Sequence, residues 1–209
     1  ADQALTTQRI MLDVVIALVP VMLVALYVFR AYAVKQLAIC IVSCLAAEAL
    51  FTKMRSRALP LKDLSALVTG IILALSLPGP APWYVGVIAS FVAIGIGKVV
   101  FGGVGMNIFN PAMVGRAFVM IAFASVLAAS GYQDAGSSVD AVTQATPLDT
   151  YKQTGAVAPL MALFLGFTNG SLGETSALAC LIGGLYLCIR RTASWEIPAG
   201  VIGATLVLG

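Results

Sequence analysis

The sequence predicts an all-α polytopic membrane protein, a bundle of helices of which several cross the bilayer. Of its 209 residues, 60% are hydrophobic and only 10% are charged. The apolar residues gather in long runs, and a helix needs about 20 such residues to cross a hydrocarbon core. Breaker residues and cations separate these runs, as they separate the spans of polytopic proteins.

We expect a single transmembrane domain over residues 1–209 whose spans follow the apolar runs. The expected spans are about 10–29, 34–51, 61–77, 85–101, 112–129, 174–189 and 197–209. Residues 156–167 number only about a dozen, too few for a straight crossing, so they are expected to form a short or re-entrant piece. The sequence stops at Gly209 inside an apolar run, which predicts that it is truncated at its C-terminus.

Charge in the loops predicts the orientation of the chain. Four cations surround one short loop, which is typical of the cytoplasmic side; they are Lys53, Arg55, Arg57 and Lys62. Counting crossings from there puts the loop 130–157 on the periplasmic side, and this loop has three aspartates against one lysine. Arg190 and Arg191 fall on the cytoplasmic side only if 156–167 does not cross.

Two segments that are far apart in the chain have similar sequences. Asp63-Leu64-Ser65-Ala66-Leu67 and Glu174-Thr175-Ser176-Ala177-Leu178 share the pattern acid-x-Ser-Ala-Leu and continue apolar. In each, the acid is expected in the first helical turn, where the helix dipole favours negative charge. An inverted repeat starts one helix inside and its mate outside, which again requires a 156–167 that does not cross fully. The alternative is a chance match of short segments.

Composition excludes several classes of function. The chain has no His, so imidazole catalysis and His-ligated haem or metal sites are excluded for it, and we expect no metal site. Its net charge of +3 comes without a basic arm, which argues against a nucleic-acid partner. The four cysteines lie in apolar runs and are interpreted as small buried residues, although Cys40 and Cys44 share a helix face on which a cluster could bind.

One short stretch is polar, within the expected periplasmic loop. From Asp140 to Leu148 it reads Asp-x-x-Thr-x-Ala-Thr-Pro-Leu. Ala145 and Pro147 leave the Thr146 hydroxyl without bulky neighbours, and the proline biases Thr146 toward an extended backbone. Chemistry alone does not separate a modified hydroxyl here from an ordinary loop threonine.

The stretch resembles the covalent flavin attachment site of the RnfD/NqrB family, whose members belong to the Rnf electron-transport complex and to the sodium-pumping NADH:quinone reductase. The resemblance implies that a flavin transferase joins FMN to Thr146 through a phosphoester, with Asp140 and Thr143 in the same motif. Gln144 departs from the pattern, because the family usually has Gly there. The runs 97–112 and 171–176 are also similar to the family, so the resemblance covers most of the chain.

Three polar residues near the fifth span are further candidates for binding a cofactor. Asn107 and Asn110 lie at a helix break, where their amides could bind a flavin ring edge or a cation. Equally, they could cap the fifth span. Arg116, a few residues into that span, is costly in lipid and is expected to face protein, water or a phosphate.

Charged groups in the apolar runs are candidates for an ion pathway. Beyond the first span, the candidates are two carboxylates within or at the edges of these runs, Glu48 and Glu174. Glu174 has a structural alternative as a helix-start acid. Lys98 is expected to snorkel back to the cytoplasmic interface. The glycines around it are expected to let helices approach closely: Gly95, Gly97, Gly102, Gly103 and Gly105.

The resemblance implies a membrane component of an ion-translocating ferredoxin:NAD oxidoreductase in the bacterial inner membrane, which passes electrons between flavins and drives sodium or proton transport. It implies the other components of that Rnf complex and membrane lipid as partners. Whether a second, non-covalent flavin binds is not decided by the resemblance. The alternative within the family is the quinone reductase member. The alternative from another class is a small-solute channel or transporter without a redox role, whose pore uses the glycine-rich breaks.

Overall fold

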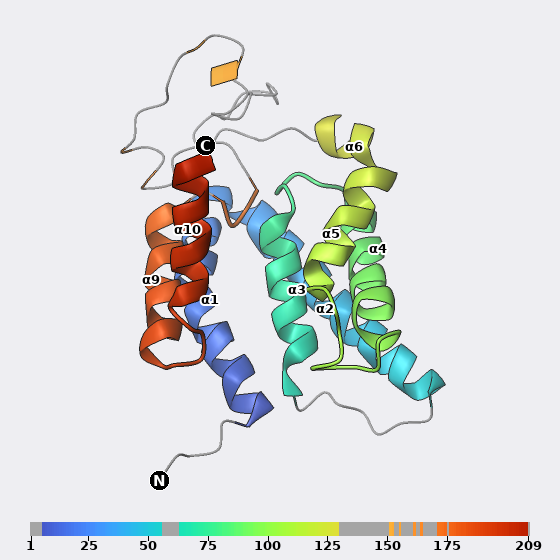
Figure 1. Cartoon of the computed structure of the whole chain (residues 1–209). Coiled ribbons are helices and arrows are strands. Elements are labelled where there is room, and N and C mark those ends of the chain that lie inside the picture. The colour runs from blue at the N-terminus through green and yellow to red at the C-terminus, as the bar shows by residue number, and fades with distance from the viewer. Residues whose placement is uncertain are drawn as a thin grey trace.

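The computed structural model describes residues 6–55, 63–129, 151–152, 155, 161, 164, 171–174 and 176–208. Every regular element within these ranges is a helix, and the helices form a bundle (Figure 1). The predicted all-α class is therefore confirmed.

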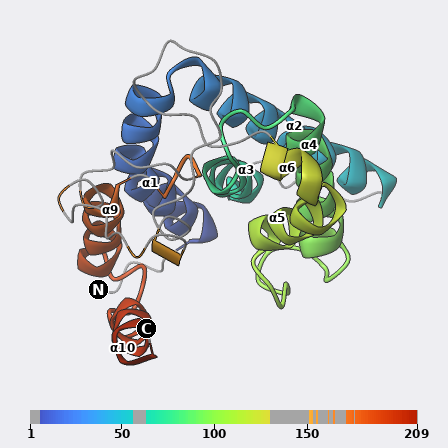
Figure 2. The same cartoon turned by 90° about the horizontal axis from the view of Figure 1, so that it is seen from above.

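Two long helices come first. α1 spans Thr7–Phe29 and α2 spans Ala31–Met54. Arg30 alone joins them, with a backbone φ of 47°, and the two helices meet at a corner (Figure 2). By length and composition these are the two described helices that are long and apolar enough to cross a membrane alone, and the expected spans 10–29 and 34–51 lie within them.

A short helix, α3 (Ser65–Ser76), lies at the centre of the bundle (Figure 2). Nearly all of its residues are buried, and it packs against α1, α2, α4 and α5. Twelve residues cover about 18 Å, less than a bilayer core. The chain leaves α3 through Leu77 to Gly79, which are buried, so protein surrounds this non-helical backbone as membrane depth requires.

The next two expected spans each contain a break. α4 (Trp83–Ile94) continues as the π-helical turn η2 (Gly95–Val99). After a loop, α5 (Pro111–Ala122) ends at Phe123 and α6 (Ala124–Ala129) follows. α5 lies tightly against α4 because Gly115 has no side chain: a Cβ there would lie 2.4 Å from the carbonyl oxygen of Ala89.

The glycines between residues 95 and 105 have two different roles. Gly97 permits a close approach, because a Cβ there would lie 2.8 Å from the Cα of Pro111. Gly103 instead adopts a φ of 114° in the loop, and nothing lies within 4 Å of the place where its Cβ would be. The predicted close approach is therefore confirmed for Gly97 and wrong for Gly103, where backbone conformation selects glycine.

The last two helices lie on the other side of α1. α9 (Ala177–Ile189) packs against α1, where a Cβ on Gly183 would lie 2.2 Å from the carbonyl oxygen of Ala17. α10 (Glu196–Leu208) lies at the edge of the bundle. Apolar side chains along α10 are exposed, among them Ile197, Val201, Leu206 and Val207.

The two acid-x-Ser-Ala-Leu segments start their helices from opposite ends of the bundle. α3 begins at the end where α1 begins, and α9 begins at the other end (Figure 1). This is the antiparallel relation that an inverted repeat predicts. The predicted place of the acids is wrong in detail, because Asp63 and Glu174 both precede their helices instead of lying in the first turn.

The ends of α6 and α9 bear on the expected short segment. α6 ends and α9 begins at the same end of the bundle (Figure 1). The chain between them therefore starts from and returns to that end. Apart from Met161 and Phe164, residues 156–167 lie outside the described residues, so their re-entrant conformation stays a prediction.

Candidate functional site

A buried ion pair joins α2 to η2. The ammonium of Lys98 donates a hydrogen bond to Oε1 of Glu48. The side chains are 4% and 2% exposed, respectively. The prediction that Lys98 snorkels to the interface is therefore wrong. A π-helical turn holds one residue more than an α-helical turn, which changes where the following side chains point, and Lys98 lies on this turn.

Two more polar groups complete this cluster at the start of α3. The Lys98 ammonium also donates to Oγ of Ser65. The Ser65 hydroxyl in turn lies 2.7 Å from Oδ1 of Asp63, which also accepts the backbone N–H of Ser65 at 2.9 Å. The cluster of Asp63, Ser65, Glu48 and Lys98 thus links α2, α3 and η2 through charge and hydrogen bonds.

One atom of the cluster has no hydrogen-bond partner among the described residues. Oε2 of Glu48 is buried, and no described donor lies within hydrogen-bonding distance of it. A buried carboxylate is costly unless both its charge and its lone pairs are satisfied. The Lys98 ammonium balances the charge, but the second carboxylate oxygen has no donor among the residues that the structure describes.

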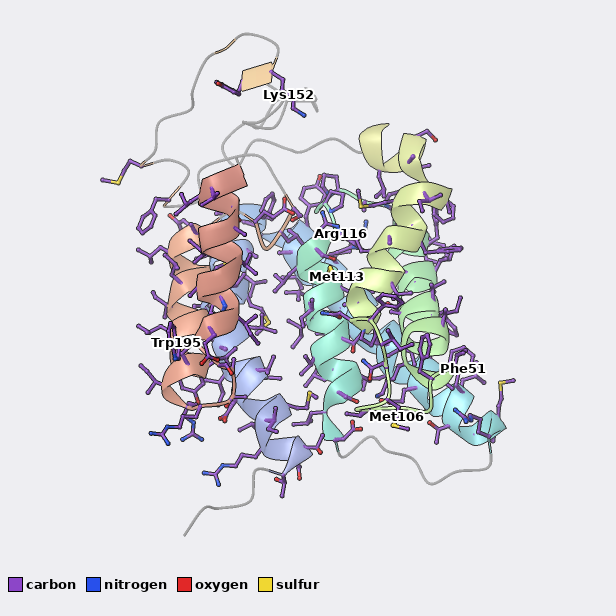
Figure 3. All side chains as sticks on the ribbon, viewed as in Figure 1. Phe51, Met106, Met113, Arg116, Lys152 and Trp195 are labelled. Carbon is purple, nitrogen blue, oxygen red and sulfur yellow. The ribbon has the colours of Figure 1, made fainter. Side chains whose placement is uncertain are left out.

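The cluster lies near the end of the bundle that carries the cations of α2. Glu48 is about two turns before the end of α2 at Met54. Beyond it, the guanidinium of Arg55 donates to the carbonyl of Val99 at 2.6 Å, which fastens the end of α2 to the end of η2. Phe51 and Met106 mark this end (Figure 3).

A second ion pair brings together two residues that the sequence singled out separately. Arg116 on α5 lies 3.4 Å from Oε1 of Glu174. The other carboxylate oxygen of Glu174 accepts the backbone N–H of Ser171 at 3.3 Å. Unlike the first pair, this one is open to its surroundings, with side chains 30% and 56% exposed. The partner of Arg116 is thus protein, one of the three predicted alternatives.

The segment 171–173 that precedes Glu174 packs on the end of α3. Leu172 N–H donates to the carbonyl of Leu77 at 3.3 Å, and Gly173 N–H donates to the carbonyl of Leu75 at 2.7 Å. This break lies at the end of the bundle opposite the cations of α2, and Arg116 lies well above Met106 in Figure 3. The two candidate ion-pathway carboxylates, Glu48 and Glu174, therefore belong to separate sites.

The two asparagines serve the backbone near α5. Oδ1 of Asn110 accepts the N–H of Ala112 at 3.0 Å, so Asn110 is the N-cap of α5, with Pro111 at the first helical position. The amide of Asn107 donates to the carbonyl of Phe109 at 3.3 Å. The capping alternative is confirmed for Asn110, and a role for either residue at a cofactor stays a prediction.

The structure reveals a carboxylate that the sequence reading passed over. Asp13, about two turns into α1, is 1% exposed. Its carboxylate accepts hydrogen bonds from Thr192, Arg190 and Tyr186, at 3.1, 3.2 and 3.4 Å. These bonds fasten α1 to the C-terminal end of α9. An acid within an apolar helix was the signal available in the sequence.

The residues of the flavin motif, Asp140, Thr143 and Thr146, lie outside the described residues. Among the cysteines, Cys40 and Cys44 are buried as expected, whereas Cys180 is exposed, contrary to expectation. No group of three or more His, Cys, Asp or Glu side chains that could hold a metal ion occurs in the described part of the chain.

Comparison with known proteins identifies a family along the whole chain. The model of the NQR2, RnfD, RnfE family matches residues 1–209. The chain is 43% identical over 197 residues to the D component of the "Na(+)-translocating ferredoxin:NAD(+) oxidoreductase complex" of Acetobacterium woodii, covering 92% of this chain and 61% of that protein. It is 37% identical over 213 residues to the D component of the "Proton-translocating ferredoxin:NAD(+) oxidoreductase complex" of Clostridium ljungdahlii, covering 97% and 64%. The chain thus spans somewhat less than two thirds of the length of these relatives.

Proposed function

Because the chain belongs to the NQR2, RnfD, RnfE family, we propose that it is part of the membrane component of an ion-translocating ferredoxin:NAD oxidoreductase, which couples electron transfer to ion movement. The observation that carries the proposal is the match of the family and of these two relatives over nearly the whole chain. One relative is named for Na⁺ and the other for protons, so the proposal includes both ions.

The proposal includes a covalent FMN on Thr146, with Asp140 and Thr143 in the attachment motif. Its support is the Asp-x-x-Thr-x-Ala-Thr-Pro-Leu pattern, together with the ends of the loop, since α6 ends and α9 begins at one end of the bundle. Arg116, the partner of Glu174 on α5, is a partly exposed guanidinium, a group that suits a phosphate. When bound, the flavin supplies electron transfer, and the protein holds and tunes it.

The test of the attachment site is the loss of covalent fluorescence. In the full-length protein, expressed with its flavin transferase, Thr146→Ala is expected to abolish flavin fluorescence in a denaturing gel. Thr150→Ala changes the same residue type in the same loop outside the motif and is expected to leave the fluorescence intact. A fluorescent Thr146→Ala band, or a flavin on another residue by peptide mass spectrometry, would refute the assignment.

We also propose the bacterial inner membrane as the location, with the flavin loop in the periplasm. The support is the cluster of cations after α2 and the acidic loop 130–157. Alkaline phosphatase fused after Arg57 is expected to be inactive, and the same enzyme fused after Gly136 active. The reverse pattern would overturn the orientation and the place of the flavin together.

The proposed partners are the other components of the Rnf complex, the flavin transferase during maturation, and membrane lipid. The family name covers members of both the Rnf complex and the NADH:quinone reductase. The electron acceptor distinguishes these two complexes. Purified complex is expected to reduce NAD⁺ with reduced ferredoxin. Reduction of quinone by NADH would assign the chain to the quinone reductase, and a colourless, redox-inactive protein would point to a channel or transporter.

A further inference from the structure

The cluster around Glu48 has the composition of a cation site. Its acceptors are the Glu48 carboxylate, the Ser65 hydroxyl and, behind that hydroxyl, the Asp63 carboxylate. All are hard oxygen donors, the ligand type that small hard cations prefer. They come from α2 and from the start of α3, two elements that pack closely together. The Lys98 ammonium lies among them.

We propose that Glu48, Ser65 and Asp63 form a binding site for a small monovalent cation, and that the Lys98 ammonium occupies this site as a tethered substitute. The incoming cation displaces the ammonium and takes its place beside Glu48. One positive charge leaves as another enters, so the buried charge of the site is unchanged. The identification of this cation with the ion moved by the complex rests on the proposed function.

Two observations favour a cation site over a purely structural ion pair. Oε2 of Glu48 is buried and has no donor in the described part of the chain, whereas a pair retained only for structure would be expected to satisfy both oxygens. In addition, Lys98 lies on a π-helical turn, an element that is frequent at functional sites. This turn ends at Val99, one residue after Lys98.

The position of Lys98 allows the ammonium to leave. Its four-carbon stem carries a compact charge that can rotate away without moving the backbone. Val100, two residues on, is 71% exposed, so the end of η2 reaches the surface of the bundle. We expect the displaced ammonium to move toward this end of η2, where Arg55 contacts the carbonyl of Val99. Among the described residues, the titratable groups around the site are Cys44 and Glu48 on α2, Asp63 before α3, and Lys98 itself.

The test removes the tethered cation and measures equilibrium binding. Lys98→Met is made in the full-length protein within its complex, and the thermal unfolding midpoint is titrated with NaCl at fixed pH against choline chloride. A second titration varies the pH in choline alone. We expect Lys98→Met to bind the cation at least tenfold more tightly than the parent protein. Stabilisation by Na⁺ identifies sodium as the occupant, and stabilisation only by lower pH identifies a proton.

Further variants separate the site from general effects of charge. Ser65→Ala, which keeps every charge, is expected to weaken cation binding severalfold in the Lys98→Met background. The double variant Glu48→Gln/Lys98→Met folds without a buried charge in the pair and is expected to lose the response. Arg116→Met makes the matching change at the open pair and is expected to leave the half-saturation point unchanged.

The proposal is overturned if Lys98→Met responds to Na⁺ and to pH as the parent protein does, or if the double variant retains the response of Lys98→Met. The titration involves no turnover, so it is independent of the redox reaction. A complex that moves no ion would contradict the proposed function even if the cation site is present. A complex that moves ions with an unaltered Lys98→Met response would contradict only the cation site.

Discussion

Two ion pairs of similar chemistry lie at opposite ends of this bundle, and they differ mainly in burial. Glu48 and Lys98 are enclosed between α2, α3 and η2, with almost no exposed side-chain area. Arg116 and Glu174 lie on α5 and in the turn before α9, with side chains 30% and 56% exposed, respectively. Enclosure makes the charges of the first pair depend on each other, because removing either leaves the other unbalanced in a low dielectric.

The difference follows from the elements that carry each pair. Glu48 lies within a long helix that packs on α3 and α4, and Lys98 reaches it from η2, which continues α4 and also contacts α2. Glu174 lies in a non-helical turn, so neighbouring backbone covers only part of it. A pair held by packed helices is enclosed, whereas a pair held by a turn stays accessible to solvent, lipid headgroups or a ligand.

The largest effect is expected from opening the enclosed pair. Lys98→Met, in choline buffer without Na⁺, leaves the Glu48 carboxylate buried and unpaired. We expect it to lower the free energy of unfolding of the full-length protein by about 3–5 kcal/mol. The measurement is denaturant unfolding in mixed micelles, followed by tryptophan fluorescence.

The double variant Glu48→Gln/Lys98→Met is the control for this prediction. It removes both charges at once, so it is expected to recover most of the stability lost in Lys98→Met. The single variant Glu48→Gln completes the cycle. A loss in the double variant equal to the sum of the two single losses would show that the pair is not coupled, and the contrast between the two sites would then disappear.

An intermediate effect is expected at Asp13, whose carboxylate is buried but whose partner Arg190 is 41% exposed. Asp13→Asn keeps the shape of the side chain and removes the charge that three donors share. We expect the thermal unfolding midpoint to fall by about 3–6 °C, between the effects at the enclosed and the open pair. Asp134→Asn, in the acidic loop, is a control that is expected to leave the midpoint unchanged. If Asp13→Asn lowers the unfolding midpoint as much as Lys98→Met does, burial of one partner is sufficient to give an ion pair the full effect of enclosure.

Local sequence features predicted the helices and the polar positions, but not the pairs. Apolar runs indicated where helices lie, because burial and lipid both require a continuous apolar surface. Glu48 was recognisable as a carboxylate inside such a run. Its partner was not, because Lys98 is 50 residues away and reaches it only through the packing of α2 with η2. The π-helical turn that positions Lys98 leaves no periodic signal in the sequence.

The same limit applies to the second site, with one instructive exception. Arg116 and Glu174 are 58 residues apart and meet only in the fold. Asn110 is different, because its cap involves the backbone two residues on, and the adjoining proline marks the helix start. Local roles of this kind are readable from sequence. Asp13 was not among the candidates because only carboxylates beyond the first span were considered, and its donors Tyr186, Arg190 and Thr192 are more than 170 residues away.

The smallest effect on stability is expected at the open pair, and its dependence on salt sharpens the contrast. Arg116→Met removes one charge from a pair that is partly exposed, so we expect a loss of about 0.2–1 kcal/mol in the free energy of unfolding. The interaction is also expected to weaken as the salt concentration rises from about 0.05 to about 0.5 M. Mobile ions screen exposed charges, and the screening length is roughly 10 Å at about 0.1 M salt and shorter at higher concentrations. A double-mutant cycle of Arg116→Met and Glu174→Gln at both salt concentrations measures the coupling directly. The cycle of Glu48 and Lys98, repeated with choline chloride, is the control and should not respond to salt. A coupling at Arg116 that exceeds about 2 kcal/mol, or that salt leaves unchanged, would show that this second pair is enclosed in the assembled protein as the first one is.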